Sequence, residues 1–177
     1  MTRKFLFCFP LRAGNIIFGY IVILISVAVI AYNLYQLGLT LVSEDYENNE
    51  KFRNFENVEK IFGESKGSLV RTITMAYCAS YIIIGTLLLL FASFLTCGAY
   101  KANHCLVSTF FGYSFLHLFL TIGLVVWETL SAGWIQLGLV VASDFLLVVC
   151  LFSVKYLMEA IRTGHIYSRP GEVLYKY

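Results

Sequence analysis

The sequence predicts an all-α fold: a four-helix bundle that is integral to a membrane. Four apolar segments make up most of the 177 residues, and each is longer than the roughly 20 residues that a helix needs to cross a bilayer. Hydrophobic residues account for 59% of the chain and charged residues for 14%, a balance that no soluble domain of this size has the core to bury. We expect one membrane domain over residues 1–177, with spans at about residues 14–42, 72–99, 105–127 and 134–156.

The first apolar segment, residues 14–42, is interpreted as a retained helix. Signal peptides have an apolar region of about 7–15 residues, which this segment far exceeds. Asn15 lies close to its start, and no cleavage site of small residues is followed by polar sequence. We therefore count it as the first of the four spans.

The distribution of lysine and arginine predicts that both termini are cytoplasmic. If the helices alternate, the N-terminus, the turn around Lys101 and the tail at 160–177 share one side, and the loop at 43–71 and the turn near Ser131 share the other. The first side carries Arg3, Lys4, Arg12, Lys101, Lys155, Arg162, Arg169 and Lys176, and the second carries Lys51, Arg53, Lys60, Lys66 and Arg71. Eight cations against five favour a cytoplasmic first side by the positive-inside rule.

The exoplasmic loop at 43–71 is the only connection long enough to recognise a partner, and it contains no cysteine. Apolar residues recur in it at helical spacing, which predicts a short amphipathic helix at residues 48–62. The apolar face of this helix consists of Phe52, Phe55, Val58 and Phe62. Two interpretations stay open: the face lies on the membrane interface or caps the bundle, or it contacts a neighbouring protein.

An intramembrane polar pair is predicted between the third and fourth spans. His117 and Asp144 each lie about a dozen residues from the end where their span begins, so antiparallel packing brings them to similar depth. A hydrogen bond or ion pair between them would offset the cost of burying both groups, with Tyr113 and Ser114 or Ser143 as further partners. The pair would act as a clamp that fixes helix register or as part of a proton or ion relay.

Small residues recur at four-residue spacing in two spans. These pairs are Ala76 with Ser80 and Gly138 with Ala142. Small residues allow helix backbones to approach closely in a membrane. Two interpretations stay open: these residues allow helices of one chain to pack closely, or they allow copies of the chain to associate side by side as a homo-oligomer.

Three cysteines, Cys8, Cys97 and Cys105, lie close to the predicted cytoplasmic boundary. Cysteines at such positions are sites of S-palmitoylation, and the alternative is that they are ordinary thiols. At the other end of the chain, Tyr175 and Tyr177 are apolar side chains two residues apart at the C-terminus. A terminus of this kind can add as a strand to a PDZ-type scaffold, and the alternative is an unstructured tail.

The sequence contains no constellation of nucleophile, base and orienting group, and no glycine-rich phosphate loop. The three histidines, His104, His117 and His165, do not have the spacing of metal ligands. A net charge of +2 provides no basic surface for nucleic acid. We therefore expect a non-enzymatic membrane protein with neither catalytic residues nor a metal or other cofactor, in contact with membrane lipids and protein partners.

The run Cys8-Phe-Pro-Leu-Arg12-Ala-Gly14 leads directly into the first span. Together with cytoplasmic termini, a cysteine-free first loop and a minimal second one, it resembles the insect small tetraspan family that includes Pasiflora and Fire exit. Leu11, Arg12 and Gly14 form the local motif. The layout is also distantly similar to that of the lysosome-associated tetraspan proteins, although the Pro-Pro-x-Tyr tail motif of some of those proteins is absent here.

This resemblance implies a structural or assembly component of septate junctions, needed for the paracellular barrier and located in the plasma membrane at lateral cell junctions. Its partners would be other junction membrane proteins, and Arg12 would lie among the cytoplasmic headgroups. Two alternatives stay open: a sorting adaptor of endolysosomal membranes, and a small proton-coupled transporter that uses Asp144 and His117.

Overall fold

The computed structural model describes residues 4–5, 9–42, 67–131 and 134–164. It contains four long helices, α1 (Leu11–Val42), α3 (Gly67–Lys101), α4 (His104–Ser131) and α5 (Trp134–Arg162). Two strands of two residues each, β1 (Lys4–Phe5) and β2 (Phe9–Pro10), pair antiparallel just before α1. The predicted all-α four-helix bundle is confirmed, and each helix is long and apolar enough to cross a membrane.

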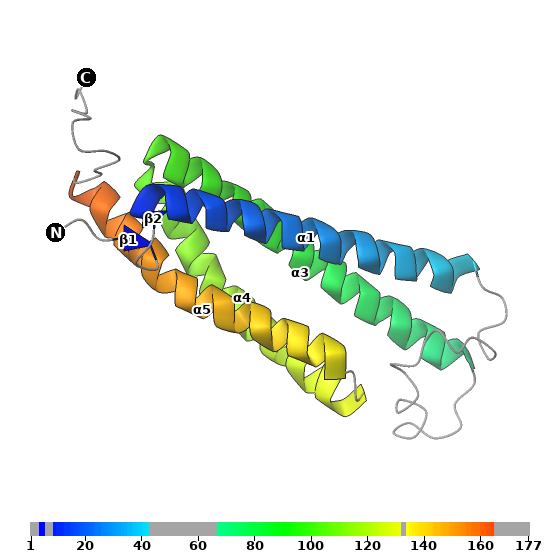
Figure 1. Cartoon of the computed structure of the whole chain (residues 1–177). Coiled ribbons are helices and arrows are strands. Elements are labelled where there is room, and N and C mark those ends of the chain that lie inside the picture. Colours follow the sequence, from blue (N-terminus) through cyan, green and yellow to red (C-terminus); the bar gives the residue numbers. More distant parts are fainter. Residues whose placement is uncertain (1–3, 6–8, 43–66, 132–133, 165–177) are drawn as a thin grey trace.

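The helices are arranged as two antiparallel pairs. α1 lies beside α3, α4 lies beside both α3 and α5, and the start of α1 lies at the same end of the bundle as the end of α5 (Figure 1). We call this end the terminal end. At the opposite end, which we call the loop end, α1 finishes and α3 begins, and these two helices extend beyond α4 and α5 (Figure 1).

The tightly packed core lies toward the terminal end. Its fully buried members include Ala92, Leu95, Val107, Phe110, Val154 and Leu157, each at most 1% exposed. Phe18 of α1 meets Phe110 of α4 edge to face, with ring centroids 6.4 Å apart. Buried aromatic and aliphatic side chains from all four helices therefore join the two pairs at this end.

The outer surface of the helices is apolar. Leu24, Phe119 and Phe145, on three different helices, are 69%, 72% and 71% exposed. Exposing each large apolar side chain to water costs about 1.5–3 kcal/mol relative to burying it. This surface is therefore suited to the acyl chains of a bilayer, which agrees with the four spans.

The turn between α3 and α4 is a Schellman motif. Ala102 adopts the left-handed conformation (φ 51°), and the Asn103 amide donates to the Gly98 carbonyl at 2.9 Å. The Asn103 side chain then accepts from the Cys105 amide at 2.9 Å and caps the start of α4. One short turn thus ends α3 and begins α4, and holds the two helices as antiparallel neighbours.

Several sequence predictions fall outside the described residues. These are the amphipathic helix at 48–62 with Phe52, Phe55, Val58 and Phe62, the cysteine Cys8, and the tail residues Tyr175 and Tyr177. They stay predictions.

We predict that Gly19→Leu lowers the stability of the bundle. A Cβ atom at Gly19 would lie 2.3 Å from Thr96 Oγ1, so α1 and α3 would have to move apart. Overpacking of this kind costs about 1–3 kcal/mol. Gly38→Leu is the matched control, because nothing lies within 4 Å of a Cβ there. Thermal unfolding in nanodiscs should show a lower Tm for Gly19→Leu than for Gly38→Leu. Equal Tm values for the two variants would contradict the close approach of α1 and α3 at Gly19.

Candidate functional site

The entry motif of α1 holds the C-terminus of α3. Arg12 Nε donates to the Ala99 carbonyl at 2.9 Å, and its Nη2 donates to the Tyr100 carbonyl. The last carbonyls of a helix have no partner within the helix and carry partial negative charge, which a guanidinium satisfies. Arg12 therefore binds protein carbonyls at the position where the resemblance implies lipid headgroups.

The other residues of the motif support the same contact. Leu11 packs against the core, and Gly14 is buried. Next to them, Asn15 is fully buried, and its side-chain amide donates to the Leu11 carbonyl at 2.7 Å and lies 3.5 Å from the Ser153 carbonyl of α5. The start of α1 is thus fixed to both α3 and α5.

A second arginine repeats this arrangement at the loop end. Arg71, near the start of α3, donates from Nη2 to the Leu41 carbonyl in the last turn of α1 at 3.2 Å. Each helix of the α1–α3 pair therefore supplies an arginine to the C-terminus of the other. The Arg71 contact therefore holds the end of α1 next to the start of α3, where the connection at residues 43–66 begins and ends.

The predicted hydrogen bond between His117 and Asp144 does not form among the described residues. His117 Nδ1 lies 3.3 Å from the Tyr113 hydroxyl one turn earlier on the same helix. The Asp144 carboxyl instead lies close to the Thr121 side chain, and its Oδ1 is buried without a hydrogen-bond partner among the described residues. Asp144 is thus level with Thr121, one helical turn from His117, which is why the two ionisable groups do not meet.

Tyr113 is itself held by α3. Its ring stacks on Phe91 with centroids 4.0 Å apart and planes 7° from parallel. The stacked ring points its hydroxyl at His117, so the orientation of the imidazole is set by α3 as well as by α4. The predicted partner Ser114 donates to the Phe110 carbonyl, and Ser143 donates to the Val140 carbonyl, so both bond to their own helices.

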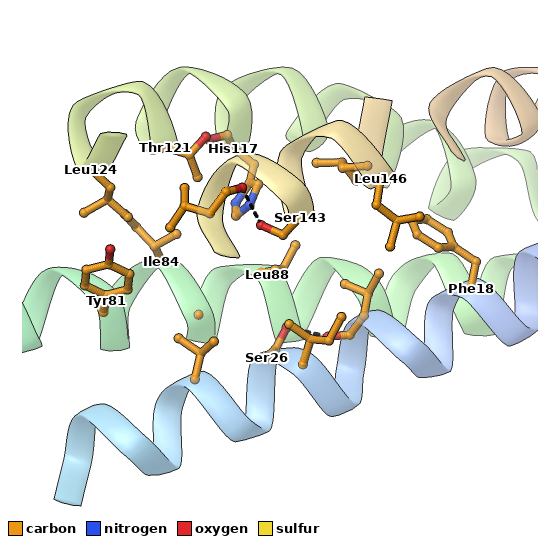
Figure 2. A pocket seen from close by; sticks show the side chains of 16 residues that line it. Phe18, Ser26, Tyr81, Ile84, Leu88, His117, Thr121, Leu124, Ser143 and Leu146 are labelled. Carbon is orange, nitrogen blue, oxygen red and sulfur yellow. Dashed lines mark hydrogen bonds between the residues drawn. The ribbon is translucent and has the colours of Figure 1, made fainter. Parts of the chain in front are cut away.

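A cavity of about 110 Å³ lies between the four helices next to His117 (Figure 2). Its lining is mostly apolar and includes Val22 of α1, Leu88 of α3, Leu124 of α4 and Leu147 of α5. On the α3 and α4 side the lining is more deeply buried, and on the α1 and α5 side Ile25, Ser143 and Leu146 are exposed. The cavity therefore opens between α1 and α5, toward the position of the lipid.

Sequence reasoning missed a buried acid near the loop end. The expected third span ends at residue 127, but the structure extends α4 to Ser131 and buries Glu128 to 1% exposure. Its Oε1 accepts from the Tyr81 hydroxyl at 2.8 Å and from the Tyr77 hydroxyl. The signal available in the sequence was the spacing of Tyr77 and Tyr81, four residues apart on one face of α3.

The remaining ligand-type and thiol side chains form no assembled site that the structure describes. In the described part of the chain, no three residues of histidine, cysteine, aspartate or glutamate are grouped as metal ligands. Cys97 and Cys105 are free and exposed at the terminal end, whereas Cys78 and Cys150 are free and buried. Palmitoylation of the two exposed cysteines stays a prediction.

We predict that Arg12→Ala destabilises the bundle by about 1 kcal/mol, because the last carbonyls of α3 lose a charged donor. Lys101→Ala is the control, since Lys101 is exposed in the same last turn of α3. Denaturant unfolding in mixed micelles measures the difference. Equal loss of stability in the two variants would show that charge at this end matters and the arginine contacts do not.

We predict that Glu128→Leu destabilises the protein by about 1–3 kcal/mol for each hydroxyl left without this acceptor. Adding Tyr77→Phe and Tyr81→Phe to Glu128→Leu should recover much of that loss, because no polar group of the cluster then remains. Glu159→Leu, at an exposed position of α5, is the control. If the losses in unfolding free energy of the Glu128 and tyrosine substitutions simply add in the combined variant, Glu128 and the two tyrosines are not coupled.

Comparison with known proteins finds no matching family model, no matching curated protein and no matching solved structure. The likeness to the small tetraspan family is therefore carried by the layout of the spans and by Leu11, Arg12 and Gly14.

Proposed function

We propose that this protein is a non-enzymatic structural component of insect septate junctions, acting in the plasma membrane through contacts with other junction proteins. The observation that carries the proposal is the reciprocal arginine arrangement of the α1–α3 pair. Arg12 and Arg71 cap the opposite ends of this pair, and Gly19 allows its close crossing. A pair fixed at both ends and in the middle suits a scaffold that holds a recognition segment in a constant position.

The location of the pair supports the same proposal. α1 and α3 extend beyond α4 and α5 at the loop end (Figure 1), and the connection at residues 43–66 begins and ends there. Arg71 joins the two ends of this connection. A partner that binds the connection would therefore engage a segment with a rigid base, which lowers the entropy lost on binding.

The transport alternative is less well supported by the geometry. A relay through His117 and Asp144 needs the two groups within hydrogen-bond reach or joined by a mobile group. Thr121 separates them, and its hydroxyl lies 3.1 Å and 3.0 Å from the His117 and Leu118 carbonyls of its own helix, to which it donates. We therefore propose the structural role.

The proposal predicts a leak of large dextran across a polarised insect epithelium that lacks the protein. Wild-type protein should restore the barrier and localise to lateral junctions. Replacing Phe52, Phe55 and Phe62 by serine should leave the protein in the plasma membrane but fail to restore the barrier, because the apolar face of the loop is removed. Dextran flux and surface immunostaining measure the two effects.

The matched control changes the polar face of the same segment, with Arg53→Gln and Lys60→Gln, which lie seven residues apart on the side of the predicted helix opposite the phenylalanines, and should restore the barrier fully. An intact barrier in cells without the protein would overturn the proposal. Steady-state accumulation of the wild type in lysosomes would favour the sorting-adaptor alternative.

A further inference from the structure

We infer that the cavity beside His117 is a binding site for a neutral, lipid-soluble molecule with one hydroxyl or carbonyl group, which enters from the bilayer between α1 and α5. This site is independent of the proposed junction role. It combines a mostly apolar lining, the imidazole of His117 and an opening toward lipid.

The lining determines that the guest is mainly apolar. The cavity of about 110 Å³ lies among aliphatic side chains from all four helices, and none of the described residues that line it is acidic or is a lysine or arginine. An apolar cavity of about 150 Å³ in another protein stays free of water and binds benzene. The part of the guest that enters this cavity is therefore slightly smaller than benzene. A charged guest would lose its hydration without gaining a compensating interaction.

The hydroxyl groups of the lining are already engaged with the protein. Ser26 donates to the Val22 carbonyl at 2.7 Å, Ser143 donates to the Val140 carbonyl at 2.8 Å, and Tyr81 donates to Glu128. Thr121 donates to carbonyls of its own helix. Because these hydroxyls donate their protons within the protein, they are not available to donate to an acceptor on the guest.

His117 supplies the hydrogen-bonding atom. The residue lines the cavity and is 6% exposed, and Tyr113 occupies its Nδ1 at 3.3 Å. Its Nε2 makes no hydrogen bond in the described part of the chain. A ring nitrogen that belongs to the cavity lining and that no protein group engages favours a guest that donates or accepts one hydrogen bond, because the bond then forms in apolar surroundings.

The opening determines the route of entry. Asn15 and Ser153 bring α1 and α5 together at the terminal end, and farther along these two helices Ile25, Ser143 and Leu146 line the cavity but are exposed. The exposed side chains of a membrane span face lipid, so a guest dissolved in the hydrocarbon layer reaches His117 by passing Ser143. A single hydroxyl is tolerable in that layer, whereas a charge is not.

The test uses the full chain in nanodiscs and a diazirine derivative of 1-octanol as photoaffinity probe. Mass spectrometry of the labelled protein should locate adducts on cavity residues such as Ser26 and Leu146. Unlabelled 1-octanol should displace the probe about 2–10 times more effectively than n-octane at equal mole fraction in the bilayer, which is the effect of one neutral hydrogen bond. His117→Leu should remove this difference.

A second variant tests the site without touching His117. Ser143→Phe places a bulky ring at the exposed opening and should reduce cavity labelling severalfold. Ser80→Phe is the matched control, because Ser80 is also exposed, also donates to its own helix, and does not line the cavity. Equal displacement by octanol and octane in the wild type, or unchanged labelling in Ser143→Phe, would overturn the inference.

Discussion

The bundle depends on the antiparallel contact between α1 and α3. In a bilayer the hydrophobic effect does not drive helices together, because lipid chains are as apolar as the side chains, so packing and polar contacts must supply the stability. Here the packing comes from a glycine crossing at Gly19, and the polar contacts come from Arg12 and Arg71. Each arginine satisfies end carbonyls that have no partner within their own helix.

The remaining polar contacts follow the same constraint. Glu128 accepts from two tyrosines of α3, Asn15 spans from α1 to α5, and most serine and threonine hydroxyls donate to their own helix. Groups that bond to their own helix contribute little to the association of helices, whereas groups that bond across helices select one arrangement. Glu128 and Asn15 therefore specify which helices are neighbours at the two ends of the bundle.

Packing is uneven along the bundle, and this matters for function. The core of Phe18, Leu95 and Phe110 closes the terminal end, while a cavity separates α1 from α5 nearer the middle. The rigid α1–α3 pair provides a base for the 43–66 connection, and the cavity leaves a route from the lipid to His117. A scaffold role and a small-molecule site are therefore compatible within one bundle.

The four spans and their antiparallel order follow from the amino-acid sequence, because length and hydrophobicity alone decide whether a helix can cross a bilayer. The sequence also identifies His117 and Asp144 as intramembrane polar residues. Their hydrogen-bond partners come from the packing of the helices, since a hydrogen bond depends on helix rotation and on shifts of a single turn that composition does not encode. For the same reason the expected third span stops at residue 127, before Glu128: the two tyrosine donors of Glu128 lie about 50 positions away in the chain, and only the packing of α3 against α4 brings them to it.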